Sequence, residues 1–283
     1  MTLTRSTPHD RGHDDIRSAK AGEQSTPHGG AIRPPKLTVV MPVFNERATI
    51  EEIIFRVQDV DIDKEIVIID DGSTDGSREF LAQLANLIEA DAPIMKFPQR
   101  ALRIDNVRVF FQERNSGKGA ADRRGFEEAR GDLVIVQDAD LELDPKDYHR
   151  LIDPIERDVA DVVYGSRFLG KTRQGSVSLY YLGNQFLTGL SNVITRLRVT
   201  DVWVGYKVFR RDVLHRIRLR EDRFGFEPEV TAKIAKLGCR VVEVPVSYTA
   251  RSREDGKKIG WKDAVRGVWC TLRYTLVPGS TRR

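Results

Sequence analysis

Apolar runs and helix-spaced amphipathic segments alternate along most of the chain. Short β-branched runs typical of buried strands lie at residues 37–44, 65–70, 107–112, 132–138 and 161–166. Between them, the apolar spacing predicts helices at residues 46–57, 75–90 and 118–129, and another from Pro145. This alternation is typical of an α/β fold with a mainly parallel central sheet and helices on both faces.

The second half of the chain has a less regular pattern. We expect helices at residues 179–197 and 227–237, strands at residues 206–210 and 239–248, and an amphipathic helix over residues 261–276. Residues 91–105 contain two prolines and mixed charges, so we expect an inserted loop there. The expected organisation is a disordered leader at residues 1–35, a folded domain at residues 36–250 and a basic amphipathic segment at residues 251–283.

Composition and charge narrow the class of protein. A hydrophobic content of 40% and a charged content of 31% are ordinary for a globular protein. We expect a cytoplasmic location, because no signal peptide and no run of about 18 apolar residues is visible. Cys239 and Cys270 lie in different expected elements, which favours structural thiols over a disulfide or a metal site.

The basic residues gather at the end of the chain. Residues 251–283 carry nine Lys or Arg against three acids, a net +6, which leaves −2 for the rest of a chain whose total is +4. Such a segment suggests an anionic partner, for example a membrane surface, although a solvated charged tail is the alternative. No nucleic-acid-reading module accompanies it, so we expect no nucleic-acid partner.

Polar residues follow the expected strands at the edge where parallel sheets bind ligands. Asp138, Asp140 and Glu142 follow one apolar run at every second position, and alternate residues of a strand face the same way. Like carboxylates held together repel each other unless a cation lies between them, and such oxygen ligands suit Mg²⁺ or Mn²⁺. We therefore predict a metal site here, with a solvated turn as the alternative.

Two further strand ends carry candidate ligand-binding residues. In 70-DDGSTDGS-77, Asp70 or Asp71 could bind a base or ribose, while Gly72 and Ser73 suit a turn and a helix cap. In 113-ERNSGKGAA-121, Lys118 at a helix start could approach a diphosphate. Neither a P-loop nor a dinucleotide-binding glycine motif is present. Together with a metal, these residues suit cleavage of a bond to a nucleotide diphosphate.

An ordered set of motifs then resembles a known family. The chain is similar to glycosyltransferase family 2, and within it to the polyprenol-phosphate (dolichol-phosphate-like) mannosyl- and glucosyltransferases. The motifs are VVMPVFNE, IIDDGSTDGS, ERNSGKGAA, QDADLE, GSRFLG, FGFEPEVTAKIAKLG and GKKIGWKDAVRG. The resemblance covers residues 37–274 and implies a GT-A catalytic domain. It also implies a GDP- or UDP-sugar donor and inverting transfer of a hexose to a polyprenol phosphate.

The resemblance also implies roles for individual residues. The nucleotide-binding residues would be Pro42, Phe44, Asn45, Glu46, Asp71, Gly72, Ser73, Lys118, Asp138, Ala139 and Asp140. Asp138 and Asp140 would hold the metal, with Glu142 near it. Asp201 remains from the acceptor motif, and Arg167 would bind the acceptor phosphate, with Arg173, Lys207 and Arg211 as further candidate cations. For each of these four cations a surface salt bridge is the alternative, and it is favoured for Arg173. A phosphate acceptor is already an anion, so it needs cations rather than a strong base.

Departures from the family pattern keep alternatives open. Trp203 and Val204 replace an acidic residue and Thr in 201-DVWVGYK-207, and Asp122 replaces a small or apolar residue; we expect both changes to affect acceptor recognition. A nucleotide-sugar-binding protein without transferase activity is one alternative. A phosphatase with an Asp nucleophile is another, although Leu141 and Glu142 stand where it needs Gly and Thr.

The helix at residues 261–276 would either rest on an anionic membrane surface or pack internally.

Overall fold

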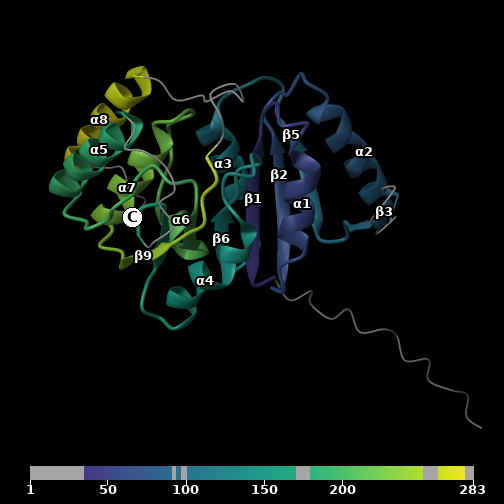
Figure 1. Ribbon diagram of the computed structural model, residues 1–283, viewed down its shortest axis with the longest axis horizontal. Helices are drawn as coiled ribbons and strands as arrows, with labels where there is room; N and C mark the ends of the chain where they lie inside the picture. The colour runs from purple at the N-terminus through teal and green to yellow at the C-terminus, as the bar shows by residue number, and fades with distance from the viewer. Residues whose placement is uncertain (1–34, 91–93, 97–100, 170–178, 251–260, 278–283) are drawn as a thin grey trace, which may run out of the picture. The chain divides into compact units, whose positions relative to one another are not determined.

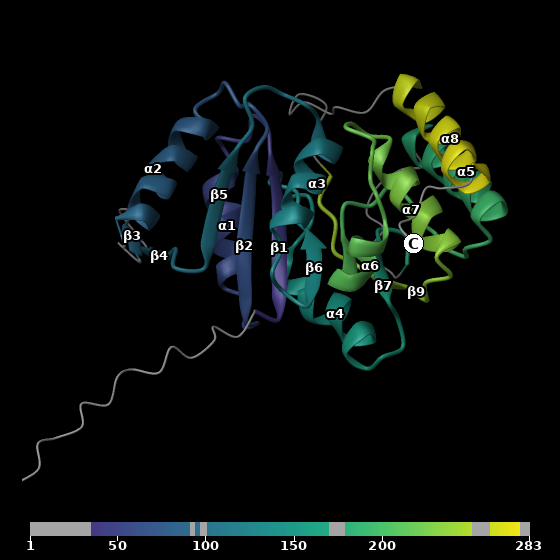
Figure 2. The same cartoon turned by 180° about the vertical axis from the view of Figure 1, so that it is seen from behind.

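Seven strands form one mixed sheet at the centre of the computed structural model, which describes residues 35–90, 94–96, 101–169, 179–250 and 261–277 (Figures 1 and 2). The order across the sheet is β5-β2-β1-β6-β8-β7-β9. The strands are β1 (Leu37–Val43), β2 (Lys64–Asp70), β5 (Val107–Phe111), β6 (Leu133–Val136), β7 (Val162–Ser166), β8 (Lys207–Arg210) and β9 (Val241–Pro245). All neighbours are parallel except that β8 runs antiparallel to β6 and β7, which confirms the mainly parallel sheet.

Helices cover both faces of the sheet because the strands are apolar on both sides. The helices are α1 (Ile50–Gln58), α2 (Ser77–Glu89), α3 (Lys118–Glu128), α4 (Tyr148–Glu156), α5 (Leu179–Thr195), α6 (Arg211–Arg216), α7 (Phe226–Lys236) and α8 (Trp261–Leu276), with a 3-10 turn at Pro145–Asp147. Val39 and Met41 of β1 pack in one core cluster with α1, α2 and α4, whereas Val40 packs in another with α3, α6 and α7. Figure 1 shows α1 in front of the sheet, and Figure 2 shows α3 in front of it.

Several predicted boundaries differ from the observed ones. Strand β6 ends at Val136, so the acids from Asp138 onward lie in a turn in which Leu141 adopts a φ of +61°. Helix α1 begins at Ile50 rather than residue 46, because Asn45 adopts a φ of +56° and a turn follows. The expected loop at residues 91–105 contains a small antiparallel pair, β3 (Ile94–Lys96) and β4 (Ala101–Arg103). The predicted leader and Arg173 lie outside the described residues, apart from Pro35.

The C-terminal helix α8 packs beside α5 and against α7, and both views show α5 and α8 side by side. Its inner side buries Cys270, Thr271 and Tyr274, whereas Trp269 and Leu276 on its outer side are 42% and 70% exposed. The helix therefore packs internally and also presents an apolar outer face, and contact of that face with a membrane stays a prediction. No helix among the described residues is long and apolar enough to cross a membrane.

A glycine in α3 tests how closely that helix packs on the sheet, and a glycine in α5 serves as the control. A Cβ at Gly125 of α3 would overlap the Cγ atoms of Val40 in β1, whereas a Cβ at Gly183 of α5 would meet no atom within 4 Å. We expect Gly125→Ala to lower the free energy of unfolding by about 1–3 kcal/mol through overpacking. Gly183→Ala should raise it by up to about 1 kcal/mol through helix propensity. Urea denaturation of both variants measures the difference, and equal effects would contradict the close α3–β1 packing.

Candidate functional site

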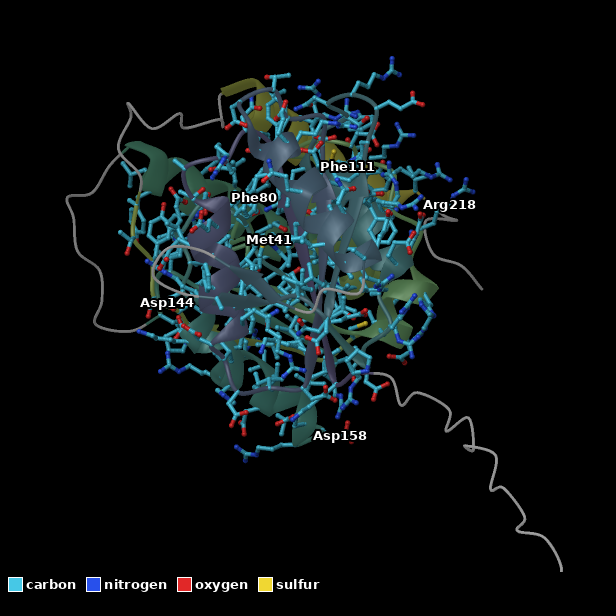
Figure 3. The ribbon with its side chains drawn as sticks, turned by 90° about the vertical axis from the view of Figure 1, so that its right-hand side faces the viewer. Met41, Phe80, Phe111, Asp144, Asp158 and Arg218 are labelled. Atoms are coloured by element: carbon cyan, nitrogen blue, oxygen red, sulfur yellow. The ribbon has the colours of Figure 1, made fainter. Side chains whose placement is uncertain are left out.

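The candidate site lies at the sheet edge formed by the carboxyl ends of β1, β2, β5 and β6. Figure 3 shows Phe111, the last residue of β5, near this edge and Asp158, which precedes β7, at the opposite edge. Ligands of open parallel sheets bind at the carboxyl edge, where the loops after neighbouring strands meet. Most of the predicted nucleotide-binding residues come from these loops; Pro42 lies inside β1 and is half-buried, and Lys118 is the first residue of α3.

The loops after β1 and β2 are joined by side-chain hydrogen bonds. The Asn45 N–H donates to the Ser73 hydroxyl at 3.0 Å, and the Thr74 N–H donates to Oδ1 of Asn45 at 2.8 Å. The Glu46 N–H donates in the same way to the Ser77 hydroxyl at 2.9 Å. The left-handed backbone of Asn45, which Asn tolerates better than most residues, turns the chain toward the β2 loop. The structure thus brings together the predicted residues Phe44, Asn45 and Glu46 with Gly72 and Ser73.

Asp71 joins the β2 loop to the start of α3. Its carboxylate is buried and accepts the N–H groups of Ser116 at 2.8 Å and Gly117 at 2.7 Å. Burial raises the pKa of Asp71, and the two backbone hydrogen bonds oppose that rise. Gly72 allows the approach, because a Cβ there would lie 2.7 Å from the backbone of Arg114 and Asn115. Asp71 therefore holds the site loops together, and its contact with a base stays a prediction.

Lys118 lies between two carboxylates. Its Nζ is 2.8 Å from Oδ1 of Asp138 and 3.4 Å from Oε1 of Glu227, and all three side chains are largely buried. Burial alone would lower the pKa of Lys118, but these carboxylates outweigh burial and raise it well above its usual value. Glu227 was missed as a site residue, although it lies in the motif FGFEPEV. Only the packing of α7 against α3 shows that it faces Lys118.

The predicted carboxylates fit a metal only in part. Ala139 between them is buried in the core, and Oδ1 of Asp140 accepts the N–H of Glu142 at 3.1 Å. Within the described ranges, no three His, Cys, Asp or Glu side chains gather closely enough to hold an ion. The three predicted ligands are therefore not assembled at one point, because the turn after Val136 breaks the strand alternation. Asp138 and Asp140 still fit Mg²⁺ or Mn²⁺, since such ions need one or two carboxylates when substrate phosphates complete their shell.

Asp122 lies one helical turn after Lys118 and is fully buried. Neither of its carboxylate oxygens has a hydrogen-bond partner among the described residues. Burial raises the pKa of Asp122 well above its usual value, and Lys118 opposes that rise only in part. Burial therefore disfavours the charged form of this carboxyl group, so this departure from the family pattern adds a buried polar group to the site.

Arg167 and Asp201 form a buried pair at the end of β7. The Nε and Nη2 atoms of Arg167 donate to the two carboxylate oxygens of Asp201 at 2.7 and 2.8 Å. Asn184 of α5 donates to the same carboxylate at 3.0 Å, and Asp201 is fully buried. Asp201 therefore orients Arg167 and has no exposed oxygen with which to act as a base. Arg167 also lies over the ring of Tyr248 at 5.2 Å.

Two of the other predicted acceptor-binding cations, Arg211 and Lys207, lie within the described residues. Arg211 follows β8, which runs antiparallel to β6, so it lies beside Asp132 at the opposite edge of the sheet. Its role in acceptor binding stays a prediction, and the sequence pattern did not indicate this position because it does not show strand direction. Lys207 is fully buried, donates to the carbonyl oxygen of Val204 at 2.5 Å and lies over the ring of Tyr164. The ammonium group of Lys207 therefore adds positive charge inside the fold and is not exposed to contact a phosphate.

Comparison with known proteins identifies the family. The sequence pattern of Glycosyl transferase family 2 matches residues 38–218. The chain belongs to glycosyl transferase family 2. This confirms the resemblance drawn from the motifs and removes the support for an Asp-nucleophile phosphatase. A crystal structure of glucosyl-3-phosphoglycerate synthase from Mycobacterium tuberculosis, in complex with Mn²⁺, UDP and phosphoglyceric acid, covers 87% of this chain and 80% of its own at a TM-score of 0.60 and 20% identity. That similarity supports the GT-A fold.

Named relatives within this glycosyl transferase family differ in length. Polyprenol monophosphomannose synthase of Mycolicibacterium smegmatis is 30% identical over 86% of this chain and 88% of its own. Undecaprenyl-phosphate 4-deoxy-4-formamido-L-arabinose transferase of Pseudomonas fluorescens is 29% identical over 78% of this chain. The chain spans only 59% of the length of the arabinose transferase.

The buried ammonium group of Lys207 predicts a pH-dependent effect on stability. Burial lowers the pKa of Lys207 to about 8 from 10.5, so the unfolded chain binds the proton more strongly than the folded chain does. This shift lowers the free energy of unfolding by roughly 3 kcal/mol below pH 8, and the loss disappears as the pH rises to 10.5. Lys207→Met should therefore raise the free energy of unfolding at pH 7 by about 1–3 kcal/mol, after the loss of the bond to Val204.

Urea denaturation of wild type and Lys207→Met between pH 7 and pH 10.5 checks this expectation. The stability difference between the two proteins should shrink as the pH rises through that window. The exposed Lys36→Met variant, which removes one surface charge paired with Glu156, gives the baseline. A difference that stays constant across the window would show that Lys207 carries no burial penalty.

Proposed function

We propose that this chain transfers a hexose, mannose or glucose, from a GDP- or UDP-sugar to a polyprenol phosphate with inversion, using Mg²⁺ or Mn²⁺. The contact that best supports this proposal is the Lys118–Asp138 pair, at the edge where the nucleotide motifs of the family meet. Relatives that cover most of this chain are named as transferases acting on polyprenyl phosphates. A family 2 transferase with another acceptor, and a nucleotide-sugar-binding protein, are the alternatives that the experiments below address.

The donor half of the reaction requires stabilisation of a leaving diphosphate. The loops that carry Asn45 and Asp71 would bind the nucleoside, and Lys118 would contact the diphosphate after exchanging one of its carboxylate partners. A divalent ion bound by Asp138 and Asp140 would neutralise further negative charge on that diphosphate. The loops of this site already hydrogen-bond one another, so the site would be organised before the donor binds, and such preorganisation favours charge stabilisation.

The acceptor half requires a cation rather than a base. An acceptor phosphate carries its own negative charge, and Arg167 would be the cation that meets it. Asp201, which accepts a further hydrogen bond from Asn184, fixes the guanidinium plane of Arg167 from the buried side. Exchange or sharing of the Asp201 contact would let Arg167 bind a phosphate oxygen, and bidentate geometry suits that anion.

A membrane surface would deliver the lipid acceptor. The outer faces of α5 and α8 expose large apolar side chains, namely Leu182, Phe186, Val193, Val265, Trp269, Leu272 and Leu276. Arg266 and Arg273 lie over the ring of Trp269 at 4.8 and 4.6 Å, so cations border this apolar surface. Apolar side chains bordered by cations suit peripheral binding to anionic lipid, and we place the protein at the cytosolic face of a membrane.

Nucleotide binding tests the donor site. Asp138→Asn removes one charge but keeps the side-chain shape, so we expect it to weaken UDP or GDP binding in the presence of Mn²⁺ by about tenfold or more. Asp132→Asn is the matched control, because Asp132 is 73% exposed at the opposite edge of the sheet. Isothermal titration calorimetry measures both variants. Wild type that binds neither nucleotide with either metal would contradict the proposed donor site.

Product mass then tests the transfer. Wild type should convert polyprenol phosphate to a species heavier by one hexose with one donor from a panel of GDP- and UDP-sugars. Phosphoglyceric acid, the ligand of the similar crystal structure, serves as the alternative acceptor in the same panel. Nucleotide-sugar binding without any product would favour the binding protein over the transferase.

Vesicle binding tests the apolar surface. We expect Trp269→Ser combined with Leu276→Ser to reduce binding to phosphatidylcholine–phosphatidylglycerol vesicles by about tenfold or more, because each side chain loses apolar burial in the lipid. Val159→Ser is the control, since Val159 is also exposed but lies in the turn after α4. Co-sedimentation measures the bound fraction. Equal binding by all three proteins would exclude this surface as the lipid contact.

A further inference from the structure

The segment at residues 201–205 contacts both helix α8 and Asp138 of the candidate site. In residues 201–205, the ring of Trp203 lies against Gly267 of α8, where a Cβ would overlap the ring edge. Two residues later, Gly205 lies against the carboxylate of Asp138, where a Cβ would overlap Oδ2. Because the intervening Val204 is fully buried, a shift of α8 at Trp203 cannot be absorbed by free movement of this segment.

A second segment connects α8 to Lys118. The buried carboxylate of Glu221 accepts two hydrogen bonds from Arg266 of α8, at 2.7 and 3.0 Å, and one from the hydroxyl of Tyr274 at 2.7 Å. The next carbonyl oxygen, of Asp222, accepts the N–H of Ala120 at 3.1 Å, in the first turn of α3. These contacts link α8 to the helix start that carries Lys118.

Glycines on either side of Lys118 make this second contact possible. A Cβ at Gly117 would overlap the carbonyl oxygen of Asp222, and a Cβ at Gly119 would overlap that of Glu221. The backbone of the Glu221 segment therefore touches both neighbours of Lys118. The two segments converge, because one ends on Asp138, the other on Lys118, and these side chains lie 2.8 Å apart.

We propose that Trp203 and Glu221 are positioning residues through which α8 sets the geometry of the Lys118–Asp138 pair. This inference rests on the proposed function, which assigns that pair to the donor diphosphate. Trp203 is one of the departures from the family pattern, and the structure gives it a packing partner in Gly267. The helix proposed to meet the lipid surface is thus the helix that holds the donor site.

Hydrogen exchange tests the coupling without any nucleotide. In Glu221→Ala, the amides of Ala120 and Ala121 should exchange at least about tenfold faster, because the segment that contacts the first turn of α3 loses its anchor on α8. Asp222→Ala is the matched control: its side chain is 57% exposed and pairs with Arg123, not with α8, and the mutation leaves its carbonyl oxygen in place. Unchanged exchange in Glu221→Ala would overturn the inference whatever nucleotide binding shows.

Nucleotide affinity tests the consequence for the site. Trp203→Ala and Glu221→Ala should each weaken UDP or GDP binding by about tenfold, Trp203→Phe should restore part of the loss, and Asp222→Ala should stay within about threefold of wild type. Gly267→Ala should weaken binding as well. Alanine normally favours a helix interior, so weaker binding there with thermal stability retained points to displacement of Trp203. Variants that lose stability but bind as wild type does would assign both residues a purely structural role.

A double-mutant cycle separates the inference from the proposed function. If Glu221 acts through Lys118, Glu221→Ala should weaken binding much less in a Lys118→Met background than in wild type. Fully additive losses would overturn the positioning role while leaving the donor site intact. Wild type that binds no nucleotide would instead overturn the proposed function, and the exchange experiment would still decide whether α8 is coupled to Lys118.

Discussion

The ammonium group of Lys118, held between the carboxylates of Asp138 and Glu227, is the interaction on which the candidate site depends. Each of these charges has limited contact with solvent, so the opposite charges beside it offset much of the cost of its burial. Asp122, which is buried nearby and has no hydrogen-bond partner among the described residues, has a pKa that burial raises well above its usual value. A donor diphosphate or a divalent ion entering this edge must therefore replace an existing contact, so binding exchanges one charge pairing for another.

Close backbone approach makes this charge arrangement possible. Gly72, Gly117 and Gly205 each lie where a Cβ would overlap a neighbouring loop or the carboxylate of Asp138. Gly72 and Gly117 also have positive φ values, which glycine adopts without strain. The loop after β2 consequently touches the loop after β5, and two hydrogen bonds from Asp71 join them. The start of α3 touches the backbone of Asp222, and the segment with Gly205 touches Asp138 in the loop after β6. Such a rigid edge suits a reaction that depends on placing charge rather than on moving a proton.

The sequence predicted the parts of the site that lie directly after parallel strands. Asp71, Lys118 and Asp138 lie where strand–helix alternation placed them, because burial of both sheet faces leaves a clear apolar pattern. Arg211 was misplaced because the direction of β8 leaves no such pattern. Glu227 could not be assigned to the site from its spacing, since its approach to Lys118 depends on helix packing across more than 100 residues.

Helix α8 shows why an amphipathic pattern alone left two alternatives open. Its buried side, with Cys270 and Tyr274, packs on the helix layer of the fold, while Trp269 and Leu276 stay exposed on the other side. Hydrophobic periodicity reports only that one side is apolar, and a helix with apolar residues on both sides satisfies both explanations. Because the buried side also contacts Trp203 and Glu221, any force on the outer side acts on segments that touch Lys118 and Asp138. Coupling of this kind requires packed or hydrogen-bonded contacts, and α8 makes such contacts with the segment that touches Asp138 and with the segment that touches the start of α3.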